Sequence, residues 1–371
     1  QAVAHRSRAP VVCFHWAMEE ASPLPADAGQ PNASLHSRFG ALHVGTAGFT
    51  GTHWAGKFYP PHAKKSEDMF DFYQETFRVV EVNSTFYGTP SAETIASWKR
   101  RAAEGFQLGL KVPKTVTHEG QISSPQALEA LRQFLGRAAG LGPRQGPLLF
   151  QCSRGLSADV RMLACIAAEL GTSLAPCRVA FEFRHESWFK DPDVLAFLRS
   201  KNWALVMHPN SVGRATSGNA GSDVAERYRL DPLSGVVTAD FVYVRLHGDN
   251  DAHSYRYNED ELAGYARQLH GFRERGLDVY CFLLNDDADA AMPQNAKRLL
   301  ALAHGLAGED VPRGPKLAKQ RSLKSFFASA AAPQKRPRAA EGEFSIGRNS
   351  DSETPAPKEV AVLAHGKIHC F

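Results

Sequence analysis

Polar side chains that could do chemistry recur at the ends of short apolar segments. In the stretch 80–83, two valines alternate with Glu81 and Asn83. This period-two pattern is typical of a β-strand that carries both polar side chains on one face. Burying a carboxylate or an amide costs free energy unless the group has a partner. The pattern therefore predicts either a buried hydrogen-bond network or a site at the end of this strand.

Five more apolar segments contribute polar side chains of the same kind, and these complete the candidate site. Lys111, Arg184 and Arg245 are the cations, and they could hold a phosphate or a carboxylate, because guanidinium and ammonium groups match those anions. The amides among them could orient a substrate. The predicted substrate-binding residues are Asn83, Lys111, Gln151, Arg184, Arg245 and Asn285.

Proton transfer needs groups that can exchange a proton near neutral pH. Glu81 or Glu182 could act as a general base. Histidine titrates in the physiological range, so His247 or His118 could act as an acid or a base. The predicted catalytic residues are Glu81, Glu182 and His247.

Two other interpretations of the same residues compete with catalysis. Glu182 and Arg245 could form a structural ion pair that closes a barrel. A metal could bind through Glu81, Glu182, His208 and His247, but the sequence lacks His-x-His and His-Glu-x-x-His spacings. The nearby cations also disfavour a metal, so no metal ligand is predicted and the cofactor is left unknown.

Eight short apolar segments alternate with amphipathic helical patterns, and these elements must position the candidate residues. Such alternation predicts a parallel sheet covered by helices, and eight units in about 250 residues fit a TIM (β/α)8 barrel. An open doubly wound sheet is the alternative, but no Gly-x-Gly-x-x-Gly turn follows the first strand. The expected strands are 41–46, 78–84, 106–112, 146–151, 177–184, 203–207, 240–247 and 277–285.

The composition of the chain is typical of a globular protein with extensions. The chain has 371 residues, of which 43% are hydrophobic and 22% charged, as in ordinary globular proteins. Its six cysteines form no Cys-x-x-Cys pair and are expected to be reduced intracellular thiols. No apolar run reaches the length of a membrane span, so no membrane is expected. The predicted division is a disordered extension (1–40), the barrel (41–308) and a disordered basic tail (309–371).

Several segments together resemble the YecE-like family, also called domain of unknown function 72. These segments are Gly45–Phe49, Trp54–Pro60, Val80–Tyr87, Phe181–Trp188, Val242–Gly248 and Asn285–Asp286, which occur in order within residues 41–306. The resemblance implies a TIM barrel but no reaction. At the level of the fold alone, it extends to barrel enzymes that act on sugars and on abasic DNA. The stretch Gln151-Cys-Ser departs from the Gln-Leu-Pro that is usual in the family, at the loop after the fourth strand.

The tail contains a second recognisable pattern at residues 320–327. It resembles the peptide box that binds the eukaryotic replication sliding clamp (PCNA), with Gln320, Leu323, Phe326 and Phe327 at the anchor positions. In one helical turn Leu323 and the two phenylalanines fall on the same side and form an apolar plug. A chance match in a low-complexity tail is the alternative. We interpret the pattern as a clamp-binding site.

A basic cluster at residues 335–338 strengthens that interpretation. It could be a nuclear localisation signal, or it could give some affinity for DNA. The combined expectation is a nuclear protein, which could also be cytoplasmic, that is recruited to the clamp and acts on DNA or another phosphate-bearing substrate in repair or replication. One alternative is a metabolic hydrolase or isomerase for small sugar-like substrates. Another is a binding module without catalysis.

Overall fold

Strands and helices alternate along the part of the chain that the structure describes. The structure is a computed structural model and describes residues 39–119, 122–171, 177–209, 236–248, 254–286 and 289–312. The strands are β1 (Leu42–Thr46), β2 (Val79–Val82), β3 (Gln107–Lys111), β4 (Gln145–Gln151), β5 (Val179–Glu182), β6 (Ala204–Met207), β7 (Phe241–Leu246) and β8 (Asp278–Leu283). The α-helices are α1 (Ser66–Thr76), α2 (Ala92–Arg101), α3 (Lys114–Thr117), α4 (Pro125–Ala138), α5 (Val160–Gly171), α6 (Ser187–Lys190), α7 (Pro192–Ser200), α9 (Glu259–Glu274) and α10 (Ala291–Ala307), and the 3-10 helices are η1 (Thr52–Trp54), η2 (Asn83–Phe86) and η3 (Ala139–Arg144).

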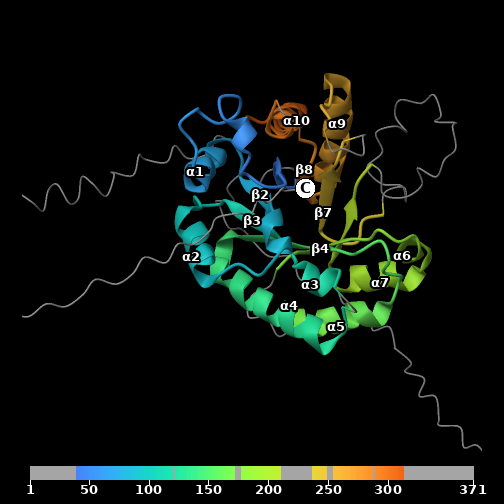
Figure 1. The fold of residues 1–371 in the computed structure, drawn as a ribbon. Coiled ribbons are helices and arrows are strands. Elements are labelled where there is room, and N and C mark those ends of the chain that lie inside the picture. The colour runs from blue at the N-terminus through green and yellow to red at the C-terminus, as the bar shows by residue number, and fades with distance from the viewer. Residues whose placement is uncertain are drawn as a thin grey trace, which may run out of the picture. The chain divides into compact units, whose positions relative to one another are not determined.

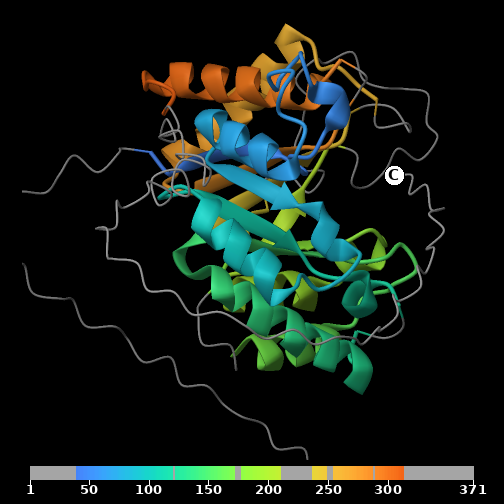
Figure 2. The same ribbon diagram turned by 60° about the vertical axis from the view of Figure 1, so that its left-hand side comes forward.

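The strands form one parallel sheet that curves into a nearly closed barrel. Its order is β1-β8-β7-β6-β5-β4-β3-β2, so the first strand pairs with the last. At the seam Ala47 bridges to Glu81, and the Gly48 amide donates to the Glu81 carbonyl at 2.8 Å. The helices lie on the outside of the strands (Figures 1 and 2). The predicted TIM barrel is therefore confirmed.

At the seam between β1 and β2, a tyrosine hydroxyl connects backbone groups that regular strand pairing does not join. The Tyr73 hydroxyl accepts from the Thr46 amide at 2.9 Å and donates to the Val79 carbonyl at 3.1 Å. Gly45 lies opposite, and a Cβ there would sit 2.3 Å from the Val79 carbonyl oxygen. The glycine therefore permits the close approach of the two strands that the hydroxyl then bridges.

Four α-helices, α2, α4, α7 and α9, begin at a residue whose side chain caps the helix. The Ser91 hydroxyl accepts from the Thr94 amide at 3.1 Å at the start of α2, and Asn258 forms a capping box with Glu261 at the start of α9. A serine followed by an acidic residue is typical of an N-cap, but Ser66 is the first residue of α1, and Lys65 at the cap position makes no side-chain cap bond. Boundaries commonly differ by this amount.

Helix α5 begins later than the pattern from residue 156 predicts. The Leu156 carbonyl accepts from the Trp188 indole nitrogen at 2.7 Å, and the Ala158 amide donates to the Ser187 hydroxyl at 2.7 Å. These bonds tie residues 156–158 to α6, so their backbone groups are not free to continue α5 toward its N-terminus. The fifth strand likewise ends at Glu182 and not at Arg184.

Two hydrophobic clusters fill the molecule. The larger lies between the strands and the helices. The smaller is built from inward-facing positions of the barrel strands, because its members alternate along each strand with members of the larger one. This inner cluster comprises Val79, Leu149, Ala180, Ala204, Val206, Phe241, Tyr243, Tyr280 and Phe282. It separates the two ends of the barrel.

Several features predicted from the sequence lie outside the described residues. These are residues 1–38 of the N-terminal extension and residues 313–371 of the tail, which include the clamp-binding motif and the basic cluster. The barrel elements run from Leu42 to Ala307. Within the described ranges, no helix combines the length and the apolar character that a bilayer crossing requires.

Candidate active site at the carboxyl ends of the strands

The polar candidates form the layer above the inner apolar cluster. Glu81 lies two residues after Val79, and Arg245 two residues after Tyr243, so both continue the inward-facing side of their strands. The same spacing applies on β4 and β5. Because all strands are parallel, these positions meet at the carboxyl ends of the strands, where TIM-barrel enzymes have their active sites. The layer comprises Glu81, Lys111, Gln151, Glu182 and Arg245.

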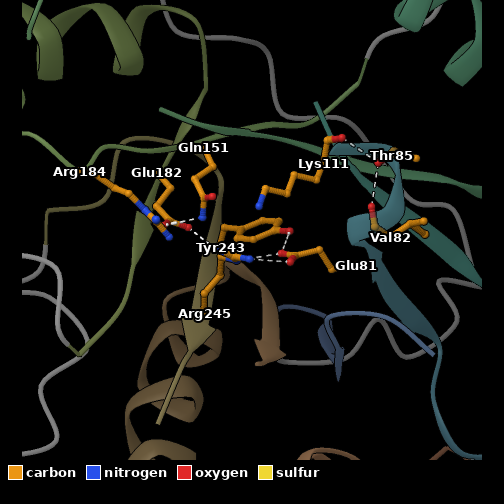
Figure 3. A network of polar contacts seen from close by, with 9 residues as sticks. All are labelled: Glu81, Val82, Thr85, Lys111, Gln151, Glu182, Arg184, Tyr243 and Arg245. Carbon is orange, nitrogen blue, oxygen red and sulfur yellow. Dashed lines mark hydrogen bonds and ion pairs between the residues drawn. The ribbon is translucent and has the colours of Figure 1, made fainter. Parts of the chain in front are cut away.

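Arg245 lies between two carboxylates at the centre of the layer. Its Nη2 donates to Glu81 Oε1 at 2.9 Å and its Nε donates to Glu81 Oε2 at 3.1 Å. Its Nη1 donates to Glu182 Oε2. All three side chains are 0–1% exposed. Figure 3 shows the guanidinium between the two carboxylates, which come from opposite sides of the barrel.

Each carboxylate has further donors. The Tyr243 hydroxyl donates to Glu81 Oε2 at 2.7 Å. Glu182 Oε1 accepts from Gln151 Nε2 and from Arg184 Nε, both at 2.9 Å. Burial opposes the ionisation of Glu182, but Arg245 and Arg184 outweigh it and hold the pKa of this carboxyl well below its ordinary value. Both carboxylates are therefore satisfied acceptors.

This arrangement changes the roles expected for the central residues. The Glu182–Arg245 pair, which was the structural alternative, is present. Arg245 is committed to two carboxylates and is almost fully buried, so it is not available to hold a substrate anion. Glu182 is a weak base, because its pKa is lowered. Glu81, Glu182 and Arg245 therefore form the floor of the site.

Lys111 extends from the end of β3 over this floor. Figure 3 shows its side chain directed toward the space between Gln151 and Tyr243. Its Nζ lies 4.1 Å from the centroid of the Phe86 ring, and no ion pair joins it to any described residue. Burial, together with the charge of Arg245, lowers the pKa of Lys111 to about 8.

Arg184 is the more accessible cation. Its Nε is bound to Glu182, while its side chain is 31% exposed, in contrast to the 1% of Arg245. The residue follows β5 directly, at the rim of the floor. Its accessible guanidinium is therefore placed to meet a ligand that enters at the carboxyl ends of the strands.

The histidines differ from the expected groups that titrate near neutrality. Burial and Arg245 lower the pKa of His247 to about 2, and burial lowers the pKa of His208 to about 4. Their rings lie 5.6 Å apart. Burial and Lys111 also lower the pKa of His118, whose ring stands edge-on to Phe86 at 5.0 Å. All three imidazoles are neutral at pH 7, so none is a ready proton donor in the free protein.

The two asparagines are not brought into contact with the ion pairs. Asn285 Nδ2 donates to the Tyr255 carbonyl at 2.6 Å and to Asn295 Oδ1 at 3.1 Å, so it fixes the segment before α9. Asn83 begins η2, and its buried Oδ1 has no hydrogen-bond partner among the described residues. An amide donor from a ligand would satisfy it.

Sequence reasoning missed residues that shape the site. Tyr243 lies two residues before Arg245, on the same face of the strand, but it is not among the predicted site residues. Thr85 Oγ1 lies 2.8 Å from the Val82 carbonyl and 2.7 Å from the Lys111 carbonyl, and so fixes η2 against β3. Phe86 provides the ring below the Lys111 ammonium. Residues 83–86 directly follow a strand, and this position at a strand end could have identified Thr85 and Phe86 from the sequence.

Asp286, which follows β8, organises the loop after β1. Its carboxylate lies 2.7 Å from His53 Nε2 and accepts from the Trp54 indole nitrogen at 3.0 Å. Trp54, which is 1% exposed, anchors this aromatic loop. No group of three or more potential metal ligands is assembled in the described ranges.

Comparisons with known proteins identify the family of the chain. The model of the family described as "Protein of unknown function DUF72" matches residues 43–319. The UPF0759 protein YunF of Bacillus subtilis strain 168 is 24% identical over 290 residues, which cover 70% of this chain and 94% of that protein.

Solved structures of the same family share the fold. A protein from Enterococcus faecalis V583 is 19% identical with a TM-score of 0.54, and the match covers 71% of this chain and 95% of that one. A protein from Thermotoga maritima MSB8 is 24% identical with a TM-score of 0.53, and the match covers 70% of this chain and 97% of that one. The chain therefore belongs to the DUF72 (UPF0759) family of TIM-barrel proteins.

Proposed function

We propose that the barrel mouth binds the phosphate group of its substrate, and that the protein is an enzyme acting on DNA or another phosphate-bearing compound. The charge of the layer carries this proposal. Among the described residues of the layer, three cations, Arg245, Arg184 and Lys111, face two carboxylates, Glu81 and Glu182. Arg245 already neutralises much of the charge on both carboxylates. The remaining positive charge resides on Lys111 and Arg184, the two groups nearest the opening.

An anion is the ligand that this arrangement favours. Excess positive charge in a mostly buried layer is costly unless an anion compensates it. The guanidinium of Arg184 offers terminal nitrogens in the planar geometry that suits phosphate oxygens. Lys111 adds a point charge while it is protonated. The floor of Arg245, Glu81 and Glu182 then serves to position these two cations.

Calorimetric titration of the full-length protein with inorganic phosphate and with short DNA containing an abasic site tests the proposal. Loss of a charge-assisted bond should weaken binding at least about tenfold in Arg184→Gln. Arg161→Gln is the matched control, because Arg161 is 93% exposed and lies on α5. If wild type binds neither ligand, or if both variants bind as wild type does, the proposed phosphate site is excluded.

A binding module without catalysis is the second candidate, and the saturated Glu81–Arg245–Glu182 floor favours it. A panel of small phosphorylated sugars, nucleotides and damaged DNA distinguishes the candidates. Turnover of DNA supports the repair function, and turnover of a sugar phosphate supports a metabolic enzyme. Binding without turnover of any compound supports the module.

We also propose that the tail recruits the protein to the sliding clamp in the nucleus. The support is the sequence pattern of Gln320, Leu323, Phe326 and Phe327 beside the basic cluster 335–338. A pulldown with PCNA should retain the wild-type protein and lose the double variant Phe326→Ala/Phe327→Ala. Phe344→Ala removes a tail phenylalanine outside the motif and is the control. Equal retention of all three proteins would refute clamp binding.

A further inference from the structure

The Lys111 amine is unusual among the lysines of the described residues. It is 9% exposed, lies at the carboxyl end of a barrel strand, and has an aromatic ring in place of a carboxylate as its nearest charge-stabilising contact. A ring face stabilises an ammonium less than a buried carboxylate does. Other described lysines, such as Lys190 and Lys57, are exposed and ion-paired. If Lys111 had only a structural role, an ion pair with a carboxylate would stabilise its buried ammonium better than the ring does.

Every element around Lys111 contributes a charged or titratable group. Glu81 comes from β2, Glu182 and Arg184 from the end of β5, Arg245 from β7, and His118 from the end of α3. Burial is the largest of the influences that lower the pKa of Lys111. Arg245 and Arg184 lower this pKa further, whereas Glu81 and Glu182 raise it. With a pKa of about 8, roughly a quarter of the amine is neutral at pH 7.5, compared with about one part in a thousand for an ordinary lysine.

We propose that Lys111 is a nucleophile that forms an imine with an aldehyde or ketone substrate whose phosphate is held by Arg184. The attacking atom is the Lys111 Nζ, and the side chain that carries it is directed toward Gln151 and Tyr243 (Figure 3). The proposal rests on the proposed function only for the phosphate contact. It names the substrate class as a carbonyl compound, and the opened sugar of an abasic DNA site belongs to that class.

The chemistry balances without a further reactant. The neutral amine adds to the carbonyl carbon, and a C–N bond forms as the C=O π bond breaks to give a carbinolamine. The carbinolamine then loses its hydroxyl group as water and becomes a protonated imine. Overall, one ammonium and one carbonyl yield one protonated imine and one water.

His118 is the titratable side chain that contacts the same phenylalanine ring as Lys111, and we assign the proton transfer in these steps to it. Its imidazole packs edge-on against the Phe86 ring whose face lies under the Lys111 ammonium. Its Nδ1 lies 2.8 Å from the Thr117 hydroxyl, which fixes the ring orientation. The neutral imidazole can accept the proton that the Lys111 ammonium must release, and can return it to the departing hydroxyl group.

Reductive trapping tests the inference. Full-length protein is incubated at pH 7.5 with 2-deoxyribose 5-phosphate, borohydride is added, and the modified lysine is located by peptide mass spectrometry. We expect one adduct per chain at Lys111, formed at least about tenfold faster than at Lys190, because roughly a quarter of the Lys111 amine is neutral at this pH. Random modification would favour Lys190, which is 69% exposed.

Two variants and a second ligand define the outcomes. Lys111→Arg keeps the charge and should abolish the adduct, whereas Lys201→Arg should not, since Lys201 is an exposed lysine near another phenylalanine, Phe197. Deoxyribose without phosphate should be trapped at Lys111 more slowly. If wild type binds inorganic phosphate but is labelled only at exposed lysines, the imine is refuted while the phosphate site stands. If Lys111 is labelled equally fast with both sugars, the imine stands and the phosphate contact fails.

Discussion

At the scale of single residues, Arg245 and Lys111 represent two ways of burying a cation. Arg245 makes three charged hydrogen bonds to two carboxylates and belongs to the framework. Lys111 lies in the same layer with an aromatic ring as its partner. Burying a cation without a carboxylate lowers stability, and such a cost is common at functional sites. The two residues should therefore respond oppositely to replacement by methionine.

Arg245→Met should lower the free energy of unfolding by about 3–5 kcal/mol, because it leaves Glu81 and Glu182 buried without their cation. Urea denaturation at pH 7 measures this change. Arg184→Met is the control, and should cost about 1 kcal/mol or less, since its guanidinium is partly exposed. A loss below about 1 kcal/mol for Arg245→Met would show that the ion pairs are not the floor of the site.

Lys111→Met should instead stabilise the protein at pH 7 by roughly 2–3 kcal/mol, because folding lowers the pKa of this lysine from 10.5 to about 8. Between pH 8 and 10.5 the unfolded chain binds more protons at Lys111 than the folded chain does, so the stability of wild type rises with pH across this window. The gain from the substitution should therefore shrink toward pH 10.5. Urea denaturation at pH 7 and pH 10 measures both effects.

Lys201→Met is the control for that series, since Lys201 is exposed. It should change the stability little at either pH. A destabilised Lys111→Met protein at pH 7 would mean that the ammonium is better satisfied than the structure indicates.

Among the elements, the alternation of short apolar segments with helical patterns carried most of the prediction. It identified all eight strands, and period-two spacing placed Glu81 on one face of its strand, because both patterns are local properties of the sequence. It could not predict which charges pair across the barrel, since Glu81 and Arg245 are 164 residues apart. It also missed the burial that lowers the pKa of His247, and the distant carbonyl that engages Asn285.

The seam between β1 and β2 is another element that only the tertiary structure reveals. Tyr73→Phe should lower the free energy of unfolding by about 1–3 kcal/mol, because the Thr46 amide and the Val79 carbonyl lose a buried partner. The same substitution should accelerate the hydrogen exchange of the β1 amides. Tyr87→Phe is the control, since Tyr87 is 65% exposed. An unchanged stability of Tyr73→Phe would mean that other contacts hold the seam.

At the scale of the whole molecule, a barrel with a positively charged mouth is joined to a basic tail. Residues 311–340 contain eight Lys or Arg and no acidic residue, while the net charge of the entire chain is only +4. Association with DNA driven by such a tail depends on the release of counterions from phosphates. The tail should supply affinity without sequence preference, and the mouth should select the chemical group.

Replacing Lys335, Arg336 and Arg338 with glutamine should reduce the salt dependence of DNA binding. Each lost phosphate contact lowers the slope of log K against log salt concentration by about 0.7–0.9, so the total reduction is about 2–3. Fluorescence anisotropy over a range of salt concentrations measures the slope. The same substitutions should leave inorganic phosphate binding at the mouth unchanged. An unchanged slope would remove the tail from DNA binding.

NMR titration of the Lys111 side chain, with and without inorganic phosphate, is the sharpest check on a phosphate-binding mouth with a reactive lysine. We expect a pKa near 8 in the free protein, because burial and the neighbouring arginines disfavour the ammonium. We expect this pKa to rise when phosphate binds, since an anion beside the amine favours the charged form. An ordinary pKa in the free protein, or a pKa that phosphate does not move, would contradict a phosphate-binding mouth with Lys111 as its reactive group.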